Sequence, residues 1–285
     1  MLLYAGKGQK LAAMRQYDEC ARILREELHA EPDQSTARLC EDIRTGKRKE
    51  RKVFAQPMAD VRLTNLPVQP TRFIGRKLEK RQVMALLSSS PLVTLTGTGG
   101  CGKTRLALEV ATDCAGEYCE GVWLVDLSPV TKPEHVTYTV ARALNVHEVQ
   151  GQTLHDSLLG YLENRELLLV LDNCEHLVQA VAELAEALLS RGKNLGILAT
   201  SREPLAIPGE TVWQVSLLDV PEDKEMVSTV LSGYDAIALF LDRASSVLPG
   251  FHLTDDNAEA VVQIARRFDG IPLALELAAV RLRAL

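Results

Sequence analysis

A glycine-rich stretch, Gly97 to Thr104, has the residue types and the spacing that bind phosphate. It reads GTGGCGKT and matches the pattern G-x-x-x-x-G-K-[ST] at every fixed position. Glycines let the backbone N–H groups turn toward phosphate oxygens, the Lys103 ammonium neutralises the β and γ oxygens, and the Thr104 hydroxyl can ligate Mg²⁺. The alternative is a glycine-rich turn that binds nothing. The predicted nucleotide-binding residues here are Gly97, Thr98, Gly99, Gly100, Cys101, Gly102, Lys103, Thr104 and Arg105.

An apolar run that ends in a carboxylate supplies the second part of this predicted site. Residues 167–173 read LLLVLDN, which is typical of a central parallel strand buried on both faces. Asp172 then lies at the carboxyl end of its strand, beside the phosphate loop, where it can hold Mg²⁺ through water. We therefore assign Thr104 and Asp172 to the metal and give Asp172 a catalytic role.

The residue after Asp172 bears on hydrolysis. An NTPase commonly has a carboxylate at this position to orient the attacking water, whereas this chain has Asn173. An amide can hydrogen-bond water but cannot take its proton, so we expect slow turnover. Glu175 is the alternative base, although the start of the following helix would carry it away from the γ-phosphate.

A third polar position follows another β-leaning run. Residues 195–200 read LGILAT and continue into Ser201 and Arg202, so a guanidinium stands at a strand end. Arg202 could read the γ-phosphate, or it could be a surface arginine that pairs with Glu203 or another acid. These residues alone leave both interpretations open.

The elements that must position these groups alternate between strand and helix. Apolar β-leaning runs at 92–95, 121–127, 167–172, 195–200 and 211–217 are separated by helical stretches such as 104–111 and 177–189. The alternation predicts an α/β fold with a parallel sheet and helices on both faces.

The first part of the chain has a different pattern. Residues 8–29 repeat apolar side chains at helical spacing, and a second helix is predicted to follow the break at 31–33. Two such helices cannot bury their apolar faces alone, which is typical of a helical repeat; any amphipathic helix pair is the alternative. The charged run 46–52 and the proline-containing 64–70 predict a solvated linker rather than a nucleic-acid arm.

Composition excludes several classes of function. The 285 residues are 46% hydrophobic and 25% charged, with a formal net charge of -6, which provides no general attraction for nucleic acid. No apolar run is long enough for a bilayer, and we expect a cytoplasmic protein with no membrane partner. The six cysteines form no CxxC pair, so we predict reduced thiols and no structural metal.

Several segments in this order resemble a known module. They are FIGRKLEK at 73–80, the phosphate loop, LVLDNCEHL at 169–177, ATSREPL at 199–205 and GIPLALELAAVRLRAL at 270–285. Together residues 64–285 resemble the NB-ARC-like nucleotide-binding module of STAND ATPases, most of all that of AfsR/SARP-type bacterial transcriptional regulators. Residues 1–46 are similar to the tail of the bacterial transcriptional activator domain, a tetratricopeptide-like module.

The resemblance implies a fold and a domain plan. It implies a P-loop NTPase whose five-stranded parallel sheet is flanked by helices, with the 195–200 strand between the phosphate-loop strand and the 167–172 strand. We place an activator-domain tail at 1–46, a linker at 47–69, a P-loop domain at 70–232 and a truncated helical subdomain at 233–285.

The resemblance also implies roles for single residues. Arg202 senses the terminal phosphate as a catalytic residue, Ile74 and Gly75 approach adenine, and Pro272 packs the base from the helical subdomain. The proline is also suited to the first position of a helix. Lys77 replaces the acidic residue usual after the Gly–Arg pair, which leaves the role of Arg76 open.

We therefore expect an ATP/ADP-binding molecular switch of a bacterial transcriptional regulator, with Mg²⁺ as cofactor and slow or no hydrolysis. The alternatives are an active ATPase that performs mechanical or chemical work and an interaction scaffold with vestigial nucleotide binding. Besides nucleotide, the expected partners are DNA, only through domains missing from this chain, and a second copy on activation. We expect His176 to pack or cap rather than ligate, and Cys101 to be a small buried filler.

Overall fold

The chain divides into two units, residues 1–61 and 62–285. The computed structural model describes residues 64–222 and 231–284 of the second unit and twelve positions of the first: 14, 15, 17–22, 25, 32, 36 and 40. Residues 14, 15, 17–22 and 25 are helical, as predicted for the first helix. Most of the second predicted helix and the linker residues 47–63 lie outside the described residues.

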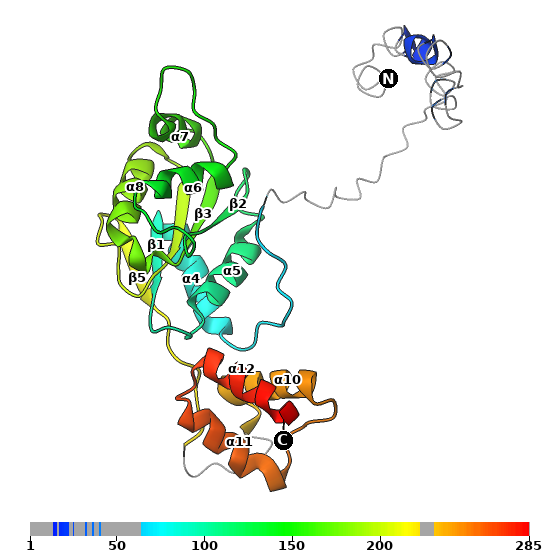
Figure 1. The fold of residues 1–285 in the computed structure, drawn as a ribbon, viewed down its shortest axis with the longest axis vertical. Coiled ribbons are helices and arrows are strands. Elements are labelled where there is room, and N and C mark those ends of the chain that lie inside the picture. Colours follow the sequence, from blue (N-terminus) through cyan, green and yellow to red (C-terminus); the bar gives the residue numbers. More distant parts are fainter. Residues whose placement is uncertain are drawn as a thin grey trace. The chain divides into compact units, whose positions relative to one another are not determined.

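Five parallel strands form one sheet in the second unit (Figure 1). They are β1 (Leu92–Thr96), β2 (Val122–Asp126), β3 (Leu167–Asp172), β4 (Leu195–Thr200) and β5 (Glu210–Gln214). Their order is β2-β3-β4-β1-β5, so β4 lies between β1 and β3 as predicted. The carboxyl ends of β1, β3 and β4 therefore meet at one edge of the sheet.

Successive side chains of a strand point to opposite faces of the sheet, and each face packs against its own layer of helices. Leu168 and Val170 of β3 share a core with α4 (Lys77–Ser89) and α5 (Lys103–Cys114). Leu169 and Leu171 share the other core with α6 (His135–Ala143), α7 (Leu154–Leu162) and α8 (Val178–Arg191). Because both faces are covered, β1, β3 and β4 are buried along their whole length.

The predicted strand at 211–217 is shorter in the structure. β5 ends at Gln214, although the apolar pattern continues through Val215 and Leu217. Val215 still packs in the core beside α5, and Leu217 packs against it. The predicted strand is too long because apolar residues continue beyond the paired segment: the Val215 N–H still donates to the carbonyl oxygen of Thr96 at 2.8 Å, but the register with β1 ends at Gln214.

A helical subdomain follows the sheet. It consists of α10 (Asp235–Val247), α11 (Asp255–Arg267), α12 (Pro272–Arg281) and the short 3₁₀ helix η2 (Leu282–Ala284). Phe240, Val262 and Leu275 lie in its own core. Pro272 occupies the start of α12, where its missing N–H has no helical partner to lose.

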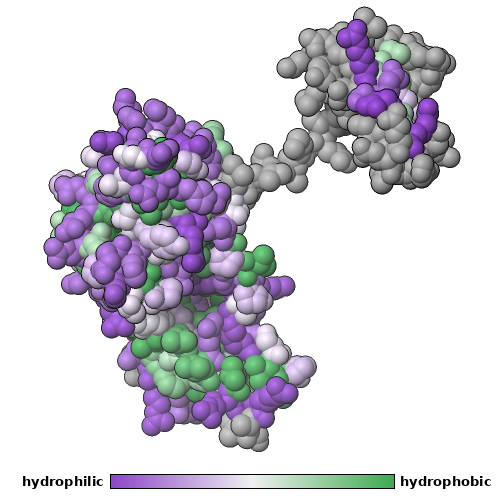
Figure 2. Space-filling model, turned by 45° about the horizontal axis from the view of Figure 1, so that its top comes forward, coloured by the Kyte–Doolittle hydropathy of each residue, from purple (hydrophilic) through white to green (hydrophobic). Residues whose placement is uncertain are grey.

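Hydrophobic side chains also reach the surface of this subdomain (Figure 2). Leu273, Leu277 and Val280 of α12 are exposed at helical spacing. Within the described parts of the chain, no helix has the length and apolar character needed to cross a membrane.

Candidate functional site

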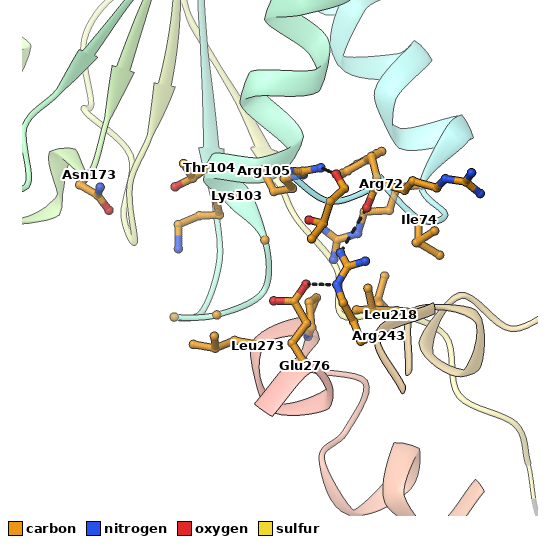
Figure 3. Close-up of a pocket in the computed structure, with 18 of the residues that line it drawn as sticks. Arg72, Ile74, Lys103, Thr104, Arg105, Asn173, Leu218, Arg243, Leu273 and Glu276 are labelled. Carbon is orange, nitrogen blue, oxygen red and sulfur yellow. Dashed lines mark hydrogen bonds and ion pairs between the residues drawn. The ribbon is translucent and has the colours of Figure 1, made fainter. Parts of the chain in front are cut away.

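A cavity of about 490 Å³ lies where the phosphate loop meets the helical subdomain (Figure 3). This volume is within the range of small-molecule pockets, about 300–1,000 Å³. Its lining comes from the segment before α4, the phosphate loop, the ends of β3 and β4, α10 and α12. The lining residues are Thr71, Arg72, Phe73, Ile74, Arg76, Gly99, Gly100, Gly102, Lys103, Thr104, Arg105, Asn173, Glu175, Arg202, Leu218, Leu239, Arg243, Pro272, Leu273 and Glu276.

The phosphate loop connects β1 to α5 with a backbone that needs glycine. Gly97, Gly100 and Gly102 have φ angles of 144°, 78° and 93°, values that side chains disfavour. A Cβ on Gly100 would lie 3.1 Å from Cβ of Leu273. The loop thus packs directly against α12, and its last glycine is followed at once by the N-terminus of α5, where anions are stabilised.

Lys103, the first residue of α5, reaches back over this loop. Its Nζ donates to the carbonyl oxygens of Gly97 and Thr98 at 2.9 and 3.1 Å. Cys101 is fully buried, in agreement with a small filler. The arrangement places an ammonium group at the concave side of the loop, where it can neutralise phosphate.

Asp172 lies at the end of β3 and accepts three hydrogen bonds. Its Oδ1 accepts from the hydroxyls of Thr104 at 2.7 Å and Thr200 at 2.5 Å, and its Oδ2 accepts from Nδ2 of Asn173 at 3.0 Å. Burial raises the pKa of this carboxyl above its ordinary value, while the Thr200 and Thr104 hydrogen bonds act in the opposite direction.

The structure thereby brings together the two residues predicted to hold Mg²⁺. A carboxylate and a hydroxyl are oxygen ligands of the kind that Mg²⁺ prefers, and Mg²⁺ usually keeps several waters besides one or two carboxylates. The residues present therefore fit a magnesium ion shared with phosphate. Among the described residues, no cluster of three or more His, Cys, Asp and Glu side chains could hold a metal by itself.

Arg202 follows β4 and forms an ion pair with Glu175, with 3.2 Å between Nε and Oε1. Glu175 belongs to the 3₁₀ helix η1 (Cys174–His176), which follows a left-handed turn at Asn173 (φ 62°). This turn keeps Glu175 in the cavity wall, contrary to the expectation that a helix carries it away. Arg202 lines the same wall, so it pairs with an acid and also lies near Gly99 of the phosphate loop. His176 bonds to the Val130 carbonyl at 2.8 Å, which agrees with a packing role.

The segment before α4 brings Ile74 to the cavity and joins it to the helical subdomain. The backbone N–H of Arg76 donates to Oδ2 of Asp235 at 2.9 Å. Gly75, at φ 73°, permits this contact because a Cβ there would lie 2.1 Å from that same oxygen. Gly75 itself is outside the cavity lining.

Arg76 has a structural role that the sequence left open. Its side chain is buried, and Nη2 donates to the carbonyl oxygen of Ser216 at 2.7 Å. Burial lowers the pKa of this guanidinium, and the carboxylate of Glu79 acts in the opposite direction. A Cβ on Gly102 would lie 3.2 Å from its Nη1, so this buried cation supports the phosphate loop.

The helical subdomain contributes the wall opposite the sheet. The N–H of Leu273 donates to the carbonyl oxygen of Gly100 at 3.3 Å. Arg243 and Glu276 point toward one another, with 3.0 Å between Nε and Oε1 (Figure 3). Nη2 of Arg243 also donates to the carbonyl oxygen of Arg72, 171 residues away, at 3.2 Å. No local sequence pattern predicts the ion pair, whose partners are 33 residues apart, or the contact with Arg72.

The predicted site residues divide into two groups in the structure. Those that line the cavity are Ile74, Gly99, Gly100, Gly102, Lys103, Thr104, Arg105, Arg202 and Pro272. Gly75, Gly97, Thr98, Cys101 and Asp172 are not among the lining residues. The guanidinium of Arg105 also contacts Gln69, Thr71 and Glu109, and so holds the preceding segment on α5.

Comparison with known proteins agrees with this geometry. The model of the NB-ARC domain matches residues 76–223, slightly more than half of the chain. A protein of Mycobacterium tuberculosis named as an HTH-type transcriptional regulator is 46% identical over 201 residues, which are 70% of this chain and 21% of that protein. Regulatory protein AfsR of Streptomyces griseus is 26% identical over 293 residues, covering 97% of this chain and 28% of AfsR.

Among solved structures, Cdc6p from Pyrobaculum aerophilum shares the fold, with a TM-score of 0.51 at 18% identity over 75% of this chain and 61% of that one. The chain spans only 21% and 28% of the length of these two regulators. The matched residues contain the phosphate loop, Asp172 and Arg202. This chain belongs to the NB-ARC domain family.

Proposed function

We propose that this chain is an ATP/ADP-binding switch module of a bacterial transcriptional regulator. The observation that supports it is the direct contact of the phosphate loop with the helical subdomain at one cavity, through the Leu273 N–H and the Gly100 carbonyl oxygen. A nucleotide in this cavity would touch both parts. It can therefore favour one arrangement of them, provided that it binds that arrangement better.

In this proposal, one set of cavity residues binds the phosphates of the nucleotide and another set contacts its base. Lys103 and the N–H groups at the start of α5 hold phosphate oxygens, and Thr104 with Asp172 holds Mg²⁺. Ile74, Leu218 and Pro272 offer apolar surface to a base. The Mg²⁺ ion, when bound, neutralises phosphate charge.

Slow hydrolysis is the second part of the proposal. Asn173 stands where a water-orienting carboxylate is usual, and its side chain already donates to Asp172. Glu175, the remaining candidate base, is paired with Arg202. We expect turnover on the order of 10⁻² per second or slower, the scale of unaided switch NTPases.

The regulatory context is also a proposal. One relative of this chain is named as an HTH-type transcriptional regulator and another as a regulatory protein, and both are several times longer. We infer that the P-loop domain comprises residues 70–232 and the helical subdomain 233–285, that the protein acts in the cytoplasm, and that it contacts DNA only through other domains. Assembly into a homo-oligomer on activation is consistent with a switch.

Calorimetric titration with Mg²⁺ and ATP or ADP tests the binding proposal. Lys103→Ala should abolish tight binding of both nucleotides, because the phosphates lose the ammonium group of the loop. Lys132→Ala is the matched control, since Lys132 is an exposed lysine outside the cavity lining. Equal affinities for Lys103→Ala and the parent would refute the site.

Two further measurements separate the alternatives. Phosphate release at saturating MgATP near 10 per second that disappears in Lys103→Ala would favour a working ATPase, since this is within the range of kinases, roughly 1–100 per second. Mass spectrometry of nucleotide released from gently purified protein addresses the scaffold with vestigial binding. That alternative predicts no bound nucleotide, whereas the switch predicts ATP or ADP.

A further inference from the structure

The ion pair between Arg202 and Glu175 lies inside the proposed nucleotide site. Both side chains line the cavity, and Nε of Arg202 is 3.2 Å from Oε1 of Glu175. Nη2 of Arg202 lies 3.9 Å from the position that a Cβ on Gly99 would take. The guanidinium therefore reaches the phosphate loop while it is held by a carboxylate of the same chain.

Glu175 depends on this arginine. Its side chain is 23% exposed, against 69% for Arg202. The second carboxylate oxygen, Oε2, is buried and has no hydrogen-bond partner among the described residues. A carboxylate in this position loses much of its hydration. The ion pair with the Arg202 guanidinium is the main interaction that offsets this loss.

We propose that Glu175 competes with the γ-phosphate of ATP for Arg202 and thereby favours ADP over ATP. This inference rests on the proposed nucleotide site. A guanidinium forms its strongest hydrogen bonds with one carboxylate or one phosphate group at a time, in a planar bidentate geometry. ADP has no γ-phosphate and leaves the ion pair intact, whereas ATP must displace Glu175 to use Arg202.

The displaced carboxylate makes this competition unfavourable for ATP. When Arg202 turns to phosphate, Glu175 keeps a buried oxygen and loses its cation, close to the negative charges of Asp172 and the γ-phosphate. Part of the attraction between Arg202 and phosphate is therefore offset. Glu175 is in this sense a specificity-determining residue that acts through Arg202.

The chain offers a matched control in Glu203. This acid adjoins Arg202 in sequence, is exposed, and forms no ion pair with it in the described part of the chain; its backbone N–H donates to Oγ of Ser201. Glu175→Gln and Glu203→Gln each remove one negative charge near the site with little change of shape. Only the first removes the competitor.

The test is calorimetric titration of the full chain with MgATP and MgADP. In Glu175→Gln the ratio of the dissociation constants, ATP over ADP, should fall about two- to fivefold, the effect of a partly exposed ion pair. Glu203→Gln should leave this ratio unchanged. In an Arg202→Ala background, Glu175→Gln should no longer alter the ratio, because the group for which the two anions compete is absent.

Two outcomes would overturn the inference while the proposed site stands: an unchanged ratio in Glu175→Gln, or a fall of the ratio that persists in the Arg202→Ala background. An unchanged ratio together with slower phosphate release would make Glu175 a base for the attacking water. Failure of the parent chain to bind either nucleotide would refute the proposed function itself.

Discussion

Replacing Gly270 by alanine would test how the helical subdomain is attached to the site. Gly270 precedes Ile271 and Pro272 at the start of α12 and has a φ of 67°. A Cβ at this position would lie 2.0 Å from the carbonyl oxygen of Leu218. The carbonyl oxygen of Gly270 accepts a hydrogen bond from the Leu218 N–H at 3.0 Å. Backbone must therefore move if a methyl group is added.

The cost has two parts. A side chain in the left-handed region costs about 1–2 kcal/mol. Separating the two backbone segments breaks the Leu218 hydrogen bond and leaves buried polar groups unpaired, which adds about 1–3 kcal/mol. We expect Gly270→Ala to lower the free energy of unfolding of the helical subdomain by roughly 2–5 kcal/mol.

Gly250→Ala is the matched control. Gly250 also has a positive φ, 93°, but no atom lies within 4 Å of the position its Cβ would take. It should cost only about 1–2 kcal/mol, the backbone part alone. The difference between the two variants then isolates the close approach to Leu218.

Urea unfolding followed by far-UV circular dichroism suits this comparison. Tryptophan fluorescence would miss the effect, because Trp123 and Trp213 both lie in the sheet. Gly270→Ala should also weaken ATP binding, since Pro272 and Leu273 shift away from the phosphate loop. Equal destabilisation by the two substitutions would refute the argument from the Leu218 contact.

The remaining predictions concern charge and thiols. Asp172→Asn should raise the free energy of unfolding at pH 7, because burial raises the pKa of this carboxyl and ionising it in the folded state is costly. The gain should shrink as the pH falls and vanish below the ordinary value of 3.8, where the carboxyl becomes protonated in both states; urea unfolding at pH 7 and below pH 3.8 checks it. Maleimide should modify exposed Cys119 before buried Cys114, whose pKa burial raises to about 12, as mass spectrometry would show. Asn173→Asp should speed phosphate release above the Lys103→Ala background; an unchanged rate would contradict the argument from proton acceptance.

Much of the fold could be predicted because its signals are local. The phosphate loop needs positive φ angles that glycine adopts, and β3 needs apolar residues on both faces because helices cover both faces of the sheet. Each of these constraints acts on a short stretch of chain. The parallel sheet and the order of β1, β4 and β3 followed from the alternation and the resemblance, and both are confirmed.

Two predictions were wrong because short sequence patterns do not specify where a strand ends or which way the chain turns after it. The predicted strand at 211–217 is too long because the apolar pattern continues through buried Val215 and partly buried Leu217, whereas β5 ends at Gln214. Glu175 was expected to move away with a helix, but the left-handed turn at Asn173 and the short η1 keep it in the cavity wall. The sequence Asn-Cys-Glu is compatible both with the start of an α-helix and with a left-handed turn followed by a 3₁₀ helix.

The phosphate loop, the strand that ends in Asp172 and the α/β class follow from the sequence alone, since glycine geometry and hydrophobic spacing are properties of neighbouring residues. The ion pair of Arg202 with Glu175 and the hydrogen bond from the Arg76 backbone to Asp235 become visible only in the folded chain. The latter contact joins residues 159 positions apart. Such contacts depend on how the helical subdomain and the ends of the strands pack in space. Hydrophobic periodicity along the chain carries no information about this packing.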